Sequence, residues 1–285
     1  MKLTTNIMLF HNELGVRKTV DVFARAGFEG IEFNADLKEY HNDDHDEAFY
    51  KDLRAYAEAQ GIPFTQAHAP FGSAYVDEEK TRQRFLEIVK SIKHVSWLGV
   101  PAIIVHPATH LEAKTEEGFA RMMEYNLDFY RRLIPYSEEF GVKIAIENIP
   151  GAVTEGAEGL LALLDALNSD AFTICYDVGH AHIRGQGAAD MIRALGTRIG
   201  CTHIHDNDGV HDSHTLPFYG TIDWESVMQA FAESGYEGNL NYESGAFVKK
   251  MPVSLRQESA NYMASVGKHL IGRYLHYKNA PGSAE

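Results

Sequence analysis

The sequence predicts a single (β/α)₈ barrel, and three observations support this fold class. Short apolar runs rich in β-branched residues alternate along the chain with longer segments of helical period, a pattern typical of βαβ units and a parallel sheet. Glycine stands at five predicted joints between a helix and the next strand: Gly27, Gly61, Gly99, Gly141 and Gly235. No linker rich in Pro, Gly or Ser divides the chain, and no glycine-rich phosphate loop follows the first run, which disfavours an open doubly wound sheet.

The predicted elements follow in order from this alternation. The eight apolar runs, expected to be strands, are residues 3–8, 30–34, 63–68, 102–106, 143–147, 173–177, 201–205 and 238–243. The expected helices are residues 16–26, 46–60, 78–98, 116–140, 156–168 and 222–234, with a closing helix over 253–277. We expect residues 1–277 to form one barrel domain and residues 278–285 to form a flexible tail.

Composition indicates a soluble globular protein with a large core. Of the 285 residues, 45% are hydrophobic and 23% charged. The only two cysteines, Cys175 and Cys201, lie inside apolar runs and are interpreted as core thiols of a reducing compartment. The N-terminus does not resemble a signal peptide, and no apolar stretch reaches the roughly 18 residues of a membrane span. A cytoplasmic location is therefore expected.

The charge balance disfavours a nucleic-acid partner. The chain has 26 Lys and Arg against 40 Asp and Glu, a formal charge of −14, and no basic run. Such a surface repels a phosphate backbone. The same composition, with 15 histidines, offers many ligands for a divalent cation.

Six consecutive predicted strands finish on or beside a metal-binding side chain. These side chains are His68, His106, Glu147, Asp177 with His180, His205 and Glu243. In a barrel, the carboxyl ends of the strands converge on one mouth. Convergent carboxylates repel each other unless a cation or proton lies between them. Imidazole with carboxylate, and without thiolate, suits Zn²⁺, Mn²⁺, Fe²⁺ or Co²⁺. The sequence therefore predicts a divalent metal at the mouth.

The loop after the seventh predicted strand offers further ligands. Asp212 and His214 stand two residues apart and can present both side chains to one ion, with His180 as a third ligand. The alternative is that this segment is a solvated polar loop.

These motifs resemble a known superfamily. The strings His68-Ala-Pro, Val105-His106-Pro107, Ile146-Glu147-Asn148, Asp177-Val-Gly-His180 and His205-Asp-Asn, together with Glu243, are similar to those of the xylose isomerase-like TIM barrels. That group includes sugar phosphate isomerases and epimerases and the endonuclease IV-type AP endonucleases. The resemblance runs from the first strand through Glu243. It is specific for the superfamily, but it does not distinguish among the activities found in it.

The resemblance implies two sets of metal ligands. In the ketose 3-epimerases and inosose isomerases, the matching ligands of one metal are Glu147, Asp177, His205 and Glu243, and both glutamates act as the acid/base pair. In the endonuclease IV branch, three zinc ions use a larger set. Its counterparts here are His68, His106, Glu147, Asp177, His180, His205, Asp212, His214 and Glu243. One to three ions of Mn, Zn, Co or Fe are therefore expected.

Several residues are candidates for contact with substrate. They are His68, His106, His180, His211, Glu32 and Phe71. His211 stands in the region where the epimerases carry a substrate-gripping arginine. Glu32, in the second strand, is expected either to hydrogen-bond substrate or to line the barrel. Phe71 suits stacking on a sugar, and it also suits a wedge in DNA.

The favoured function is a divalent-metal-dependent sugar isomerase or epimerase. It would abstract a proton next to a carbonyl and form an enediolate, with Glu147 and Glu243 as the acid/base pair. One alternative is a metal-dependent phosphoesterase or AP endonuclease with a multinuclear zinc site. A sugar lyase or dehydratase on the same site and a non-catalytic binding barrel are further alternatives. The expected partner is a small sugar, and the sequence is compatible with a homo-oligomer. Neither a membrane nor nucleic acid is expected as a partner.

Overall fold

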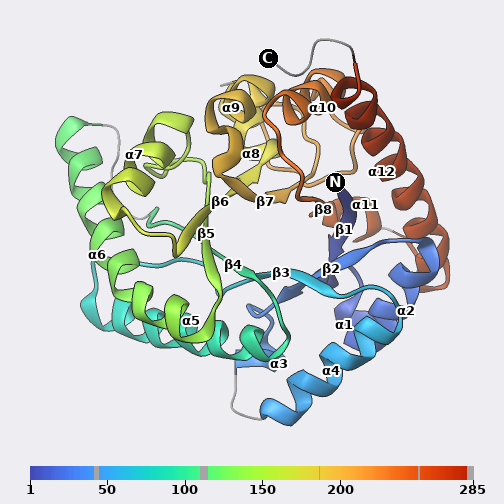
Figure 1. The fold of residues 1–285 in the computed structure, drawn as a ribbon, viewed down its shortest axis with the longest axis horizontal. Helices are drawn as coiled ribbons and strands as arrows, with labels where there is room; N and C mark the ends of the chain where they lie inside the picture. Colours follow the sequence, from blue (N-terminus) through green and yellow to red (C-terminus); the bar gives the residue numbers. More distant parts are fainter. Residues whose placement is uncertain (42–44, 110–114, 186, 250, 281–285) are drawn as a thin grey trace.

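The computed structural model confirms the predicted (β/α)₈ barrel (Figure 1). It describes residues 1–41, 45–109, 115–185, 187–249 and 251–280. The eight strands are β1 (Lys2–Asn6), β2 (Gly30–Asn34), β3 (Phe64–His68), β4 (Ala102–Val105), β5 (Lys143–Glu147), β6 (Phe172–Asp177), β7 (Ile199–His203) and β8 (Asn239–Tyr242). They pair in parallel in the order β7-β6-β5-β4-β3-β2-β1-β8. A bridge between Ile204 and Tyr242 joins the two ends of this sheet and closes the barrel.

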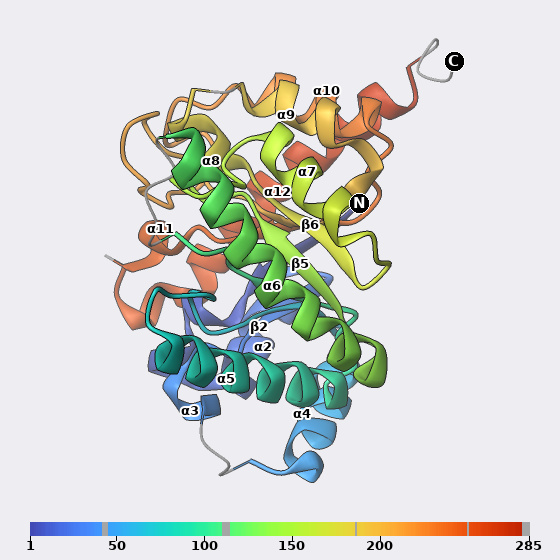
Figure 2. The same cartoon turned by 90° about the vertical axis from the view of Figure 1, so that its left-hand side faces the viewer.

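Helices surround the strands. The α-helices are α1 (His11–Leu14), α2 (Val16–Ala26), α3 (Lys38–His41), α4 (Glu47–Ala59), α5 (Glu78–Trp97), α6 (Glu116–Phe140), α7 (Ala157–Leu167), α8 (Val178–Ile183), α9 (Ala188–Leu195), α10 (Trp224–Glu233), α11 (Gly245–Lys249) and α12 (Arg256–Lys278). Short 3₁₀ turns are η1 (Ile7–Leu9), η2 (Gly196–Arg198) and η3 (Val253–Leu255). The closing helix α12 packs against both α2 and α10 (Figure 1), and α5 packs against α6, as the side view in Figure 2 shows.

Most predicted elements match within one or two residues, and three differences matter. The sequence pattern missed α8 and α9, two short helices between β6 and β7. It also placed the seventh strand at 201–205, two residues later than the observed β7. The closing helix continues to Lys278, the first residue of the predicted tail, and residues 281–285 of that tail lie outside the described residues.

Local sequence explains where the helices begin and end. Asp223, the N-cap of α10, accepts a hydrogen bond from the backbone N of Ser226 at 3.2 Å. Gly27 and Gly141 close their helices with φ of 87° and 65°, a left-handed conformation that favours glycine. These ends return the chain to the sheet and so hold the strands in register.

The core has two parts. A large apolar layer lies between the strands and the surrounding helices. A small cluster fills part of the barrel interior: Ala102, Ile104, Ala145, Cys175 and Cys201. Both cysteines are buried and free, as predicted. Among the described residues, no helix combines the length and the apolar character that crossing a bilayer requires.

Candidate metal centre

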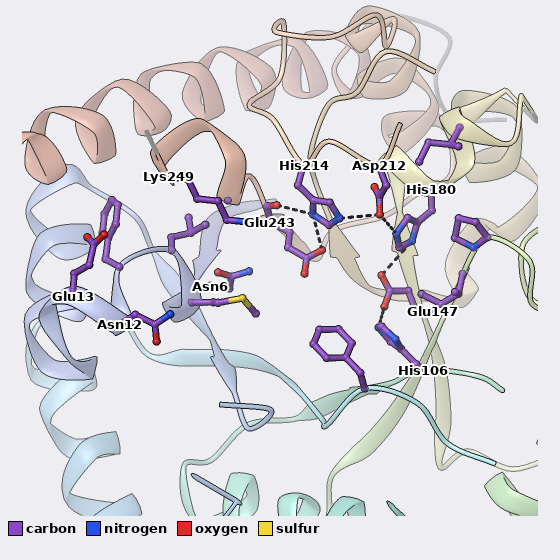
Figure 3. A pocket seen from close by; sticks show the side chains of 18 of the residues that line it. Asn6, Asn12, Glu13, His106, Glu147, His180, Asp212, His214, Glu243 and Lys249 are labelled. Carbon is purple, nitrogen blue, oxygen red and sulfur yellow. Dashed lines mark hydrogen bonds and ion pairs between the residues drawn. The ribbon is translucent and has the colours of Figure 1, made fainter. Parts of the chain in front are cut away.

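Among the described residues, the carboxyl ends of the strands bring together four groups of ligand atoms, of which three open on one mouth and the fourth, Glu147 with Cys175 and His203, is wholly buried. Within each group the ligand atoms lie within 4.8 Å of one another. The inner group is His68, His106 and Glu147; the central group is Glu147, Asp177, His203 and Glu243; the outer group is His180, His205, Asp212 and His214. A cavity of about 890 Å³ opens above them, and Figure 3 shows six of these side chains on its wall. Glu147 belongs to both the inner and the central group.

The inner group directs two histidines at one carboxylate oxygen. The His68 Nδ1 atom lies 2.7 Å from the Ala69 carbonyl, so this nitrogen donates and Nε2 is left for other partners. His68 Nε2 is 3.0 Å from His106 Nε2, and His106 Nε2 is 2.9 Å from Glu147 Oε2. Burial lowers the pKa of His106, whereas hydrogen bonding to Glu147 and nearby carboxylates outweighs burial at His68 and raises its pKa to about 9.

The central group gathers three carboxylates around one imidazole nitrogen. His203 Nδ1 lies 2.9 Å from Glu147 Oε1, 3.4 Å from Glu243 Oε2 and 3.9 Å from Asp177 Oδ2. Burial alone would raise the pKa of Glu147, but the charges of His203 and His106 hold it well below its usual range. The arrangement is therefore stable only with positive charge among the carboxylates, from either a protonated histidine or a metal ion.

The outer group is arranged around the carboxylate of Asp212. Asp212 Oδ2 lies 3.1 Å from His214 Nε2 and 3.4 Å from His180 Nε2. The His205 ring stacks on His214 at 3.9 Å between centroids, and its Nε2 is 3.1 Å from Asp177 Oδ1. Burial lowers the pKa of His180 and His214, but the surrounding carboxylates outweigh it and raise these values to about 10 and 9.

Backbone carbonyls set the proton position on two of the three outer histidines, His180 and His214, as they do on His68. His180 Nδ1 is 3.0 Å from the Asn148 carbonyl, and His214 Nδ1 is 3.1 Å from the Glu243 carbonyl. Since a carbonyl only accepts, Nδ1 donates and Nε2 is presented to the group. A neutral imidazole oriented in this way by a partner on its other nitrogen is the usual form of a metal-ligating histidine.

The Asp-Val-Gly-His segment positions two groups at once. Asp177 caps α8, because its Oδ1 accepts a hydrogen bond from the backbone N of His180 at 2.7 Å. A Cβ on Gly179 would lie 2.0 Å from the Cε1 atom of His205, so only glycine leaves room for that ring. Asn148 joins the ends of β5 and β6 by exchanging hydrogen bonds of 2.8 and 2.6 Å with the Asp177 backbone.

The loop that carries Asp212 and His214 is tied down by Asp206. This fully buried carboxylate accepts hydrogen bonds from the backbone N of Phe218 (2.9 Å), the backbone N of Ile222 (3.2 Å) and the Trp224 indole (2.8 Å). Two backbone hydrogen bonds between Asp206 and Thr215, of 2.8 and 3.0 Å, close the loop at its base. Asp206 therefore positions the outer ligands without being one.

The donor set fits a divalent ion. Within the described residues, Asp177 Oδ2 and His205 Nδ1 are buried and have no hydrogen-bond partner, and the 3.1 Å contact of His205 Nε2 with Asp177 Oδ1 lacks hydrogen-bond geometry. Buried polar atoms of this kind are costly unless something satisfies them. Imidazole nitrogens and carboxylate oxygens at this density match the preferences of Zn²⁺, Mn²⁺, Fe²⁺ and Co²⁺. The central group can hold one ion, and the inner and outer groups have the ligands for others.

Most of the residues singled out in the sequence meet at this mouth, with three differences. His205 was expected in the set with Glu147, Asp177 and Glu243 but lies in the outer group. His203, which the sequence pattern did not identify, occupies that position in the central group. His211 does not line the cavity; its side chain is 77% exposed and paired with Asp208 at 2.9 Å. Glu32 is fully buried beneath the central group, which agrees with the expected barrel-lining alternative and not with contact to substrate. Phe71 does line the cavity, with its ring 5.0 Å from those of His68 and His106.

The sequence signal for His203 was present. His203 and His205 are two residues apart, so both side chains point to the same face of the strand at different depths. The observed end of β7 at His203 decides between these depths. Asp206, in contrast, gave no sign in the sequence that distinguished it from a ligand.

Comparison with known proteins places the chain in a family. The model of the xylose isomerase-like TIM barrels matches residues 20–265. The chain belongs to that family.

Relatives within this family differ in activity. An uncharacterised protein of Sinorhizobium fredii, y4fM, is 30% identical over 81% of each chain. A probable endonuclease 4 of Bacillus licheniformis is 25% identical over 61% of this chain and 64% of its own length. Among solved structures, a D-tagatose 3-epimerase-like protein superposes with a TM-score of 0.80 at 21% identity, covering 97% of this chain and 99% of the other. The IOLI protein with a bound zinc atom gives 0.77 at 21% identity, covering 98% and 100%.

Proposed function

We propose that this protein is a divalent-metal-dependent sugar isomerase or epimerase that moves a proton next to a carbonyl group. The observation that carries the proposal is the central group. Glu147 and Glu243 approach the same nitrogen of His203, at 2.9 and 3.4 Å, from two different strands, and both line the cavity. Two carboxylates that meet at one ligand position suit a reaction in which one removes a proton and the other returns it.

Each side chain has a role in this chemistry. A divalent ion held by Glu147, Asp177, His203 and Glu243 supplies Lewis-acid polarisation of the substrate carbonyl and its neighbouring hydroxyl. One glutamate takes the proton from the carbon beside the carbonyl, and the other delivers a proton to the opposite face or to the neighbouring carbon. His180 orients a substrate hydroxyl through Nε2, and Phe71, 50% exposed, offers an apolar face for the sugar ring.

The comparisons support a sugar substrate. Proteins whose names give ketose 3-epimerases recur both among the relatives and among the solved structures of this fold. Because their identity to this chain is below 25%, the fold alone is shared securely, and the substrate assignment rests on the site.

A phosphoesterase, including an AP endonuclease, is the second candidate. The observation that favours it is that inner and outer ligand groups flank the central one, so several ions can act together on a phosphodiester. The charge of the cavity favours the sugar. Among the described residues, the lysine and arginine that line it are Lys249 and Arg256, and Arg256 is engaged by Glu13 and by the Val248 carbonyl at 2.6 Å. A phosphate backbone requires more positive charge than that.

The direct test is solvent-deuterium exchange on a panel of ketoses, with the protein loaded in turn with Mn²⁺, Co²⁺ and Zn²⁺. The proposal expects deuterium at the carbon beside the carbonyl, together with an epimeric or isomeric product. A dehydrated product would instead assign a lyase to the same site. Cleavage of abasic DNA or of a phosphodiester, without exchange into any ketose, would replace this proposal with the second candidate.

Substitution of the acid/base pair tests the assignment within the site. Glu147→Gln and Glu243→Gln are each expected to abolish turnover, a loss of at least about 10²–10⁴-fold, while the fold is kept. Circular dichroism and thermal unfolding serve as the control for folding. Full activity in either variant would refute the acid/base assignment.

A further inference from the structure

A polar layer crosses the barrel directly beneath the central group. At its centre is Glu32 of β2, whose side chain is 0% exposed. Its Oε2 atom accepts hydrogen bonds from Gln66 Nε2 at 2.6 Å, from Asn241 Nδ2 at 2.9 Å and from His203 Nε2 at 3.0 Å. These partners come from β3, β8 and β7, so four strands contribute to one buried cluster. Barrel interiors are ordinarily filled by branched apolar side chains, and a buried charge here needs a reason.

The orientation of Gln66 is fixed by a neighbour that can only accept. Gln66 Nε2 donates to the Thr202 carbonyl at 3.2 Å, so the same nitrogen also donates to Glu32. The Glu32 oxygen is therefore an acceptor, and Asn241 Nδ2, at 2.9 Å from it, is a second donor. The Oδ1 atom of Asn241 then accepts from the Thr4 hydroxyl at 2.9 Å.

This arrangement determines how His203 meets the central group. With Glu32 as acceptor, the Nε2 atom of His203 carries a proton and donates it. The lone pair of a neutral imidazole is then on Nδ1, the atom that faces Glu147, Glu243 and Asp177. His68, His180 and His214 have the opposite arrangement, with Nδ1 donating to a backbone carbonyl. His203 is the histidine that presents Nδ1, and a carboxylate orients it.

We propose that Glu32 is a positioning residue of the metal centre. It holds the proton of His203 on Nε2, aims Nδ1 at the central group, and thereby sets the affinity of that group for a divalent ion. A carboxylate on the far nitrogen also makes the imidazole a stronger ligand than a carbonyl does. The proposal rests on the metal centre of the proposed function and not on the reaction, so it holds equally for an isomerase and a phosphoesterase.

The proton position can be read in the unaltered protein. Long-range ¹H–¹⁵N spectra of histidine-labelled protein loaded with Zn²⁺ distinguish protonated from metal-bound nitrogens. The signals of His203 are identified by their loss in His203→Asn. We expect Nε2 protonated and Nδ1 bound. A proton on Nδ1, or zinc bound through Nε2, would overturn the proposal whatever the enzyme's activity proves to be.

The contribution to affinity is tested by removing the charge of Glu32 while keeping its shape. Glu32→Gln is expected to weaken Zn²⁺ binding by about 10–100-fold in a chelator competition, the usual effect of losing such a partner. Glu29→Gln is the matched control, because it is the same change on the exposed residue just before β2, which accepts a hydrogen bond from Leu3 N instead. That variant is expected to bind Zn²⁺ within about twofold of the original protein.

Equal affinities in the two variants would refute the role of Glu32. If Glu32→Gln does not fold, the spectra of the unaltered protein decide alone. Both readouts are independent of turnover. Failure of the proposed sugar reaction would therefore leave the Glu32 proposal standing, and failure of the Glu32 proposal would leave the sugar reaction open.

Discussion

Gly179 illustrates how single residues shape the candidate metal centre. It lies between the proposed ligands Asp177 and His180, and the space where its side chain would be is filled by the ring of His205. In a close-packed interior such contacts are not relieved without cost. The glycine is therefore part of the ligand geometry, although it contributes no ligand atom.

The first prediction concerns this contact. Gly179→Ala should displace His205, lower the metal content of the protein and destabilise the fold by about 1–3 kcal/mol, because the added Cβ would lie 2.0 Å from the ring. Metal analysis and thermal unfolding measure the two effects. Gly272→Ala is the control, since nothing lies within 4 Å of its Cβ position in α12, and it should stabilise by roughly 0.5–1 kcal/mol. Unchanged metal content in Gly179→Ala would contradict this reading.

At the scale of elements, the loop after β7 decides whether the outer ligand group exists. Asp212 and His214 are half-buried or exposed, and no helix or strand holds them. Their placement depends on Asp206, which ties the loop to the start of α10 through Trp224. A loop positioned by a buried carboxylate can carry ligands as reproducibly as a strand end.

The second prediction tests that dependence. Asp206→Ala leaves the buried donors of Ile222 and Trp224 without a partner and should cost about 2–4 kcal/mol in a urea unfolding experiment. It should also reduce zinc bound by His180, Asp212 and His214. Asp208→Ala, in the exposed part of the same loop, should leave the urea unfolding midpoint nearly unchanged and keep the metal. Equal metal content in both variants would show that Asp206 does not organise the loop.

The elements also show where sequence reasoning succeeds and where it ends. Long periodic segments such as α2 and α6 were predicted to the residue, because their apolar faces repeat many times. The helices α8 and α9 are too short for such a repeat, and Asp177 starts α8 directly at the end of β6. The residues at the strand ends predicted which side-chain types could bind a metal. Whether His203 or His205 joins the central group depended on where β7 ends, which the sequence pattern placed two residues too late. The burial of Glu32 depends on contacts from three other strands, which no local pattern contains.

At the scale of the whole molecule, charge balance links the centre to stability. The chain has a formal charge of −14, and several of its carboxylates are concentrated at the mouth. Without a metal, protonated histidines supply the compensating charge there. The two states of the protein, with and without metal, should therefore respond to pH in opposite ways.

The third prediction follows from the histidine pKa values. In the metal-free protein the pKa of His68 and His214 is raised from 6.5 to about 9 and that of His180 to about 10. A raised pKa stabilises the fold fully below about pH 6.5, and this stabilisation is lost as the pH rises through the folded values. The melting temperature in chelator should therefore fall between about pH 7 and 10. With Zn²⁺ bound, stability should instead be lost on acidification, as protons displace the metal. A flat profile in chelator would contradict this account.

The central claim, that the converging side chains hold metal, is tested most directly by metal content per chain. Plasma mass spectrometry on tag-free protein purified without chelators should find one to three divalent ions, chosen among Zn, Mn, Co and Fe. Replacing Asp212 and His214 together by Ala should leave the central ion and remove any ion of the outer group; full retention would exclude an outer ion. A metal-free protein that takes up none of these ions when they are added would contradict the claim itself.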